Sequence, residues 1–139
     1  MAQKSSTAKS GLNFGSRVQA QLGMLIAMFL LGIAANLIGV PSEVGGTSKA
    51  ASIIILALHG LLGLGLLINA GLIIRLSLKT DTALTKQAQV GAGVVALTFI
   101  AGVITIATKN NWWSFTMAIG FAASLPIYGL LLLRANGVR

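Results

Sequence analysis

The chain has 139 residues, of which 55% are hydrophobic and only 9% are charged, and it contains no cysteine. A soluble domain carries about 25% charged residues, and one this small could not bury so much apolar surface in a single core. The composition therefore excludes an ordinary soluble domain, disulfide bonds and thiol chemistry, and it predicts one all-α domain with lipid as its solvent.

The formal net charge is +8, because ten Lys and Arg residues face two acids, Glu43 and Asp81. A basic total often indicates nucleic-acid binding. Here the cations stand at the ends of apolar runs and do not form a patch interleaved with aromatic residues. We therefore interpret them as signals of membrane topology and expect no nucleic-acid partner.

The first 17 residues are polar, rich in Ser and basic, with no acid. They predict a flexible tail, with the alternative that a neighbouring subunit or the headgroup layer holds it. The first apolar run follows at about residues 18–40 and ends before Pro41, which lacks a backbone donor. We expect this run to persist as a membrane span, because it is longer than the apolar part of a cleaved signal peptide.

Three further apolar runs complete a predicted transmembrane domain over residues 18–139. Each is long enough to cross a bilayer as a helix, for which roughly 20 residues suffice. Short polar loops separate them, which predicts an up-down four-helix bundle. The additional spans are expected at about residues 51–75, 87–107 and 113–134.

The distribution of cations predicts the orientation. Eight of the ten lie on the side that holds both termini, and only Lys49 and Lys109 lie on the other. Positive residues favour the cytoplasmic face, so both termini are predicted to be cytoplasmic, with Trp112 and Trp113 as anchors at the opposite boundary. We expect a multi-pass protein of a cell membrane or an energy-transducing inner membrane.

A weak internal repeat suggests two tandem helical hairpins. Residues 19–21, Gln-Ala-Gln, recur at 87–89, each followed by a glycine, and residues 72–75, LIIR, resemble residues 131–134, LLLR. Two hairpins of the same orientation would be related by an axis along the membrane normal. Duplication and chance similarity between apolar helices both remain open.

Small residues spaced for helix packing are frequent. Close backbone approach through such residues drives helix association in lipid. The 17 glycines of the chain predict either a very tight bundle or small-residue faces directed towards a partner or a flat cofactor. The predicted packing positions are Gly60, Gly63, Ala88, Ala92, Ala96, Ala118 and Ala122.

His59 is the only histidine of the chain, and it is expected in the outer half of the membrane, about 12 Å into its span. Ionisable groups inside a membrane are candidates for function. A neutral imidazole can bind haem b or chlorophyll, and Met117 is expected at a similar depth as a second axial ligand. The alternative is a structural histidine that forms a hydrogen bond with Asn36, Thr105 or Thr116.

Two more polar residues are predicted inside the membrane. Asn69 is expected to form a hydrogen bond between helices, with contact to a solute as the alternative. Tyr128 is expected near a proline in the last span, where it could line a cavity. Gln21 and Gln89 are expected close to the membrane surface, and we assign them no role.

The sequence contains no paired acid and base, no nucleophile with its base and no cluster of metal ligands, so we expect no enzymatic activity. The leading hypothesis is a non-catalytic integral membrane subunit that packs with other membrane protein subunits or with its own copies. The second is a membrane cytochrome or pigment-binding protein with His59 as axial ligand. The third is a small carrier or channel for a neutral or anionic solute, lined by Asn69 and Tyr128.

Overall fold

Four long helices make up the computed structural model, which describes residues 3–39, 44–80, 82–108 and 111–137, with side chains from Phe14 onward. In lipid, apolar runs must form helices because only helices satisfy their own backbone hydrogen bonds. The four helices confirm the predicted all-α up-down bundle. The helices are α1 (Gln3–Ile38), α2 (Gly46–Ser77), α3 (Thr82–Thr108) and α4 (Asn111–Gly137).

Each helix contains a segment long and apolar enough to cross a membrane. These segments confirm the four predicted spans, and they run over Phe14–Ile38, Gly46–Ser77, Thr82–Thr108 and Trp112–Gly137. The protein is therefore an integral multi-pass membrane protein. The first helix begins well before the predicted start at residue 18, because α1 continues back to Gln3 without a break. The separate tail over residues 1–17 stays a prediction.

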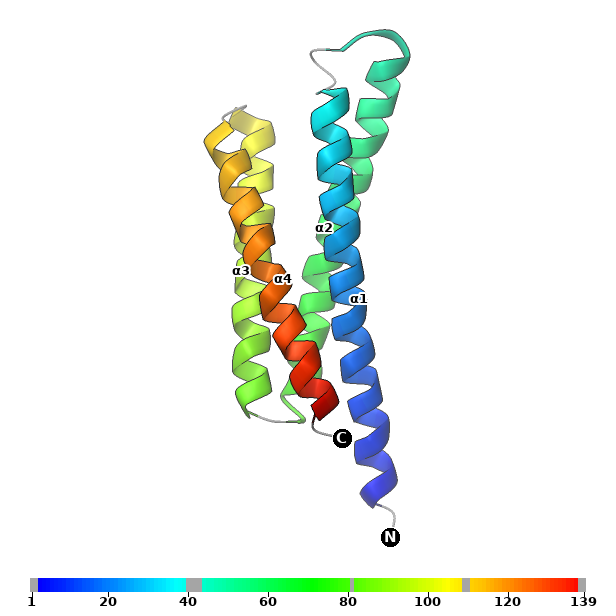
Figure 1. Cartoon of the computed structure of the whole chain (residues 1–139), viewed down its shortest axis with the longest axis vertical. Coiled ribbons are helices and arrows are strands. Elements are labelled where there is room, and N and C mark those ends of the chain that lie inside the picture. The colour runs from blue at the N-terminus through cyan, green and yellow to red at the C-terminus, as the bar shows by residue number, and fades with distance from the viewer. Residues whose placement is uncertain (1–2, 40–43, 81, 109–110, 138–139) are drawn as a thin grey trace.

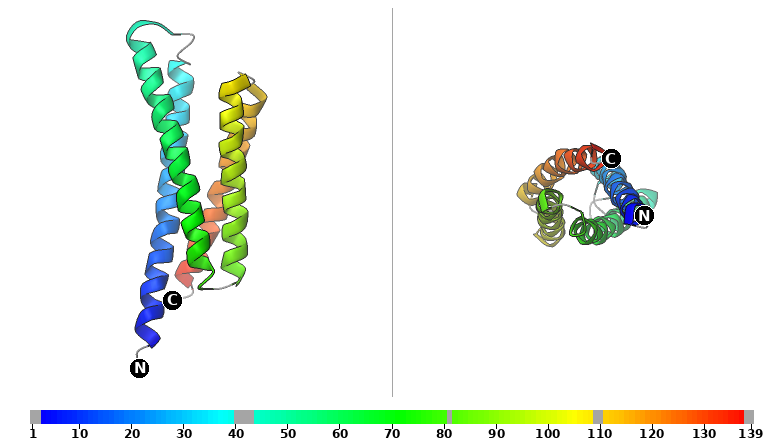
Figure 2. Two further views of the ribbon diagram at one scale, coloured as in Figure 1. Left: turned by 180° about the vertical axis from the view of Figure 1, so that it is seen from behind. Right: turned by 90° about the horizontal axis from the view of Figure 1, so that it is seen from below.

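The helices are arranged as two hairpins, α1 with α2 and α3 with α4 (Figure 1). Both ends of the described chain lie at the same end of the bundle, which we call the terminal end, and the α1–α2 and α3–α4 connections lie at the opposite end (Figures 1 and 2). The termini thus share one side of the membrane, as predicted, and their cytoplasmic location stays a prediction.

Glycines allow the two helices of each hairpin to approach closely. A Cβ atom at Gly91 of α3 would lie 3.0 Å from Cζ of Tyr128 in α4, and one at Gly102 would lie 3.2 Å from the sulfur of Met117. In the other hairpin, a Cβ at Gly63 of α2 would lie 3.1 Å from Cε of Met28 in α1 and 3.1 Å from Cδ2 of Phe99, which belongs to α3. Small residues therefore position the helices. This is expected in lipid, where the hydrophobic effect does not drive helices together.

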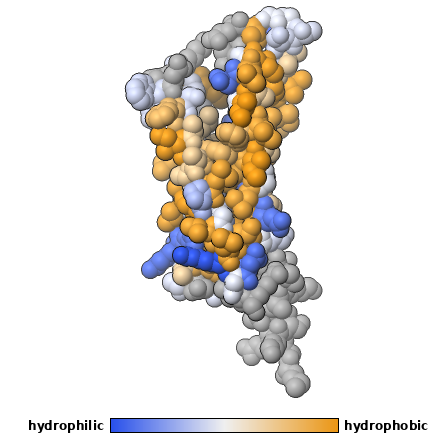
Figure 3. Space-filling model, viewed as in Figure 1, coloured by the Kyte–Doolittle hydropathy of each residue, from blue (hydrophilic) through white to orange (hydrophobic). Residues whose placement is uncertain are grey.

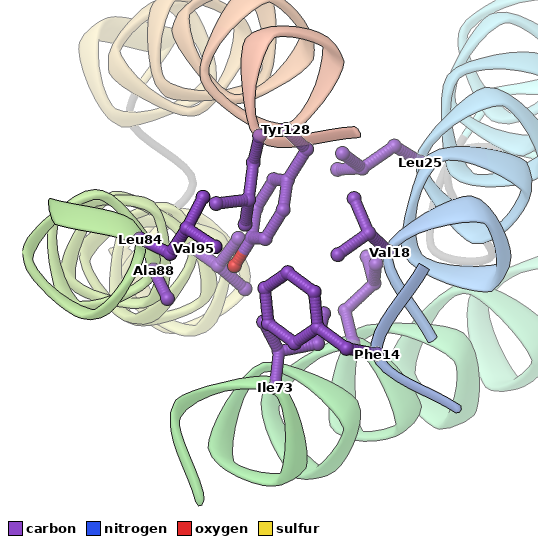
Figure 4. Close-up of a cluster of buried hydrophobic side chains, with 10 residues drawn as sticks. Phe14, Val18, Leu25, Ile73, Leu84, Ala88, Val95 and Tyr128 are labelled. Atoms are coloured by element: carbon purple, nitrogen blue, oxygen red, sulfur yellow. The ribbon is translucent and has the colours of Figure 1, made fainter. Parts of the chain in front are cut away.

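The hairpins contact each other closely only in the half of the bundle near the terminal end. Its core includes Phe14, Val18, Ile73 and Leu131, and the side chains meet between all four helices (Figure 4). The stack of Phe29 on Phe121, with ring centroids 5.4 Å apart, joins α1 to α4 at mid-height.

Beyond that level the two hairpins diverge (Figures 1 and 2). Among the described residues there, only Ser52 and Ala101 are buried. Ser52 donates a hydrogen bond to the carbonyl oxygen of Gly39, which lies in its own hairpin. We call this half of the bundle the open half.

Candidate functional site

A network of buried amides lies between α1 and α2 near the terminal end. Asn69 of α2 is 5% exposed and Gln21 of α1 is fully buried. The Nδ2 group of Asn69 donates to Oε1 of Gln21 at 2.8 Å and to the carbonyl oxygen of Arg17 at 3.0 Å. Nε2 of Gln21 donates in turn to the carbonyl oxygen of Leu66 at 3.3 Å. Asn69 therefore forms the predicted hydrogen bond between helices.

The network continues to the end of α1 through Arg17. Nη1 of Arg17 donates to Oδ1 of Asn69 at 3.5 Å. The Arg17 side chain is exposed, so its guanidinium lies at the boundary while its partner lies inside the bundle. The four hydrogen bonds of this network link a charged group at the membrane surface to the neutral amides of the core.

Tyr128 of α4 points into the core between the helices (Figure 4). It is fully buried, and its ring packs against the backbone of Gly91. The hydroxyl group has no hydrogen-bond partner in the part of the chain that the structure describes. Tyr128 stands six residues before Arg134, and Asn69 stands six residues before Arg75. The two buried polar residues therefore occupy matching positions in the two similar hairpins.

The second hairpin has its own amide at the terminal end. Nε2 of Gln87 in α3 donates to the carbonyl oxygen of Ile127 in α4 at 2.9 Å, and Nη1 of Arg134 donates to Oε1 of Gln87 at 2.9 Å. Each hairpin thus holds one arginine against a neutral amide of its other helix.

His59 and Met117 lie in different hairpins. The ring of His59 lies against α1, with Cε1 3.9 Å from the position of a Cβ at Gly32, whereas Met117 packs on Gly102 of α3. Over the described ranges, no Cα atom of α2 lies within 8 Å of one in α4. Binding of haem b or chlorophyll through His59 stays a prediction.

The alternative hydrogen bonds expected for His59 are not formed in the described structure. Its Nδ1 is buried without a partner. The hydroxyl groups of Thr105 and Thr116 donate to carbonyl oxygens of their own helices, those of Ala101 and Trp112. Asn36 is exposed. His59 is therefore a partly covered polar group in the open half.

The predicted packing positions divide into two groups. Gly63 and Ala88 are buried between helices, and Ala92 and Ala96 are half-buried. The other three positions, Gly60, Ala118 and Ala122, are exposed, and a Cβ at Gly60 would meet no atom within 4 Å. No helix of this chain covers these three residues. Gly60 and Ala118 lie in the open half, and Ala122 lies next to Phe121, at the level where the hairpins begin to diverge.

Sequence reasoning missed the importance of Gln21 and Gln87. Gln21 was expected close to the membrane surface and was assigned no role, yet its side chain is fully buried between helices. Distance along a helix gives depth, whereas burial depends on which face turns inward. The useful signal was the pair of amides in the Gln-Ala-Gln repeat, since one amide of each copy, Gln21 or Gln87, bonds to the neighbouring helix.

The chemistry of these groups is that of neutral hydrogen bonding. Within the described ranges, no three residues of the types His, Cys, Asp and Glu gather as metal ligands would. The expectation that the chain is not an enzyme stays a prediction. No protein-family profile matches the chain, and no curated protein or solved structure shows significant similarity to it.

Proposed function

We propose that this protein is a non-catalytic integral membrane subunit whose open half packs against helices of another membrane protein chain. The observation that carries the proposal is the position of Gly60, Ala118 and Ala122. They are small, exposed residues: Gly60 and Ala118 lie in the open half, and Ala122 lies next to Phe121, at the level where the two hairpins begin to diverge.

Helices associate in lipid through small residues that let two backbones approach. Inside this chain, Gly91, Gly102 and Gly63 serve that purpose, each against a large side chain of the partner helix. Ala118 and Ala122 stand one turn apart on α4 and are exposed, with no helix of this chain on them. A helix from a second chain can pack on this surface in the way that α4 packs on Gly91 and Gly102 of α3.

The buried amides support a scaffolding role. Gln21 and Asn69 satisfy each other and the nearby backbone, so they hold the first hairpin together without leaving an acid or base available for chemistry. The half near the terminal end thereby forms a fixed base, from which the two hairpins present their uncovered faces.

The test is extraction of the tagged chain from its native membrane with a styrene–maleic acid polymer, followed by sizing and identification of co-purified protein. We expect a particle larger than the monomer that contains a stoichiometric second chain or second copy. The double variant Ala118→Leu/Ala122→Leu should reduce the recovered partner at least tenfold. A monodisperse monomer without co-purified protein would contradict the proposal.

Gly93→Leu is the control, because a Cβ at Gly93 of α3 would meet no atom within 4 Å and Gly93 stands outside the open half. It also places a leucine on an uncovered helix face and should leave the assembly intact. An absorption spectrum of the same particle tests the cytochrome hypothesis. A Soret or chlorin band that is lost in His59→Ala would replace the proposed function with pigment binding.

A further inference from the structure

A belt of cations surrounds the terminal end of the bundle. Arg17, Arg75, Lys79, Lys86 and Arg134 are all exposed and stand near the ends of the four helices. Figure 3 shows the hydrophilic surface gathered in a band near this end, next to the apolar surface of the spans. This is the level at which lipid headgroups meet the protein.

Two of the five cations are oriented by the protein itself. Gln87 receives a hydrogen bond from Nη1 of Arg134 at 2.9 Å, and its own Nε2 is fixed by the carbonyl oxygen of Ile127 at 2.9 Å. The amide therefore presents its oxygen to the arginine. Since the amide is neutral, the guanidinium keeps its full charge, and its remaining N–H groups stay available to another acceptor.

Arg17 is held in a similar way in the first hairpin. Its Nη1 donates to Oδ1 of Asn69 at 3.5 Å, a longer bond than that of Arg134, and the same amide donates to the Arg17 backbone carbonyl at 3.0 Å. Arginine is the residue best suited to phosphate, because its planar guanidinium can form two parallel hydrogen bonds to one oxyanion. Holding it in place reduces the conformational entropy that binding would otherwise cost.

The charge around these arginines is not neutralised by acids. The chain has only two, Glu43 and Asp81, and of these only Asp81 belongs to the sequence at this end. We propose that Arg134 held by Gln87, together with Arg17 held by Asn69, binds the headgroup phosphate of anionic phospholipids in the surrounding leaflet. The belt attracts the anionic lipid, and the two oriented guanidiniums bind it.

The experiment uses the full chain purified in mild detergent. Bound dioleoyl-phosphatidylglycerol and dioleoyl-phosphatidylcholine are counted by native mass spectrometry during a titration with each lipid. We expect tighter binding of phosphatidylglycerol. Arg134→Gln should weaken it about tenfold, because it removes charge-assisted hydrogen bonds from the oriented guanidinium to the phosphate.

The variant Gln87→Glu distinguishes binding at the proposed site from the general attraction of anionic lipid to the cation belt. This change keeps the shape of the side chain but places a carboxylate on Arg134, so it should weaken phosphatidylglycerol binding as much as Arg134→Gln does. Arg75→Gln is the matched control, because Arg75 has the same charge at the same end but no hydrogen bond to an amide in the described structure. It should change binding less than twofold.

Three results would overturn the proposal. One is equal binding of the two lipids by the unmodified chain. Another is an equal loss in Arg75→Gln and Arg134→Gln, since that would reduce the effect to total charge. The third is displacement of phosphatidylglycerol by inorganic phosphate beyond that caused by chloride at the same ionic strength, because the ligand would then be a soluble anion. Thermal melting of each variant in detergent confirms that it is folded.

Discussion

Gly91 and Gly93 offer a sharp test of how α3 and α4 pack. Both are interior glycines of α3, two residues apart, and Gly91 alone faces the partner helix. A Cβ at Gly91 would lie 3.0 Å from Cζ of Tyr128 and 3.1 Å from Cγ2 of Ile127, whereas one at Gly93 would meet no atom within 4 Å. Substitution by alanine therefore adds the same methyl group to a position packed against α4, Gly91, and to one without neighbouring atoms, Gly93.

The magnitude follows from a difference between the two variants. Alanine favours a helix over glycine by about 1 kcal/mol in water, and this contribution cancels when Gly91→Ala is compared with Gly93→Ala. Overpacking of a filled core costs about 1–3 kcal/mol. Tyr128 is fully buried, so its ring cannot move aside freely. We therefore expect Gly91→Ala to be less stable than Gly93→Ala by about 1–3 kcal/mol.

The assay is equilibrium unfolding in mixed micelles titrated with SDS, followed by near-UV circular dichroism. A third variant, Gly91→Ala/Tyr128→Leu, removes the ring and should show a favourable coupling between the two substitutions in a double-mutant cycle. Stabilities of the two alanine variants that agree within about 0.5 kcal/mol would refute the close contact of Gly91 with Tyr128, and with it this account of the second hairpin.

Three other substitutions can be measured by the same titration. Asn69→Ala should cost about 1–3 kcal/mol, because Oε1 of Gln21 would stay buried without its donor, and a neutral result would contradict the network. Tyr128→Phe should leave stability unchanged or raise it, since the hydroxyl has no partner in the described structure; a loss above about 1 kcal/mol would reveal one. Gly120→Ala should destabilise the bundle because its methyl group would overlap the side chain of Thr98, and Thr98→Ala in the same chain should restore most of the loss. A Gly120→Ala protein as stable as the unmodified chain would disprove that contact.

The fold could be predicted from sequence because it depends on composition over long stretches. Four apolar runs separated by short polar loops permit little besides an up-down helical arrangement in a bilayer. The burial of Gln21 could not be predicted in the same way. Its depth follows from its distance to Arg17, but its direction depends on how α1 rotates against α2. In the structure that rotation brings Gln21 to Asn69.

The candidate site was predictable only in part for the same reason. Asn69 was expected to bond across helices, and it does so. His59 and Met117 were paired by counting residues from Arg75 and Arg134, which gives height in the membrane and no information on direction. The structure places His59 against α1 and Met117 against α3. Periodic small residues likewise predicted packing without saying whether the neighbour belongs to the same chain.

The concentration of close contacts within each hairpin has a consequence for biogenesis. Most of the glycine contacts that position the helices lie within one hairpin, so the first hairpin can assemble in the membrane before the second has been synthesised. The shared core near the terminal end and the contact of Gly63 with Phe99 of α3 must wait for the second hairpin. A chain divided at the α2–α3 turn and expressed as two separate pieces should therefore reassemble into the native protein, without a covalent link between its halves.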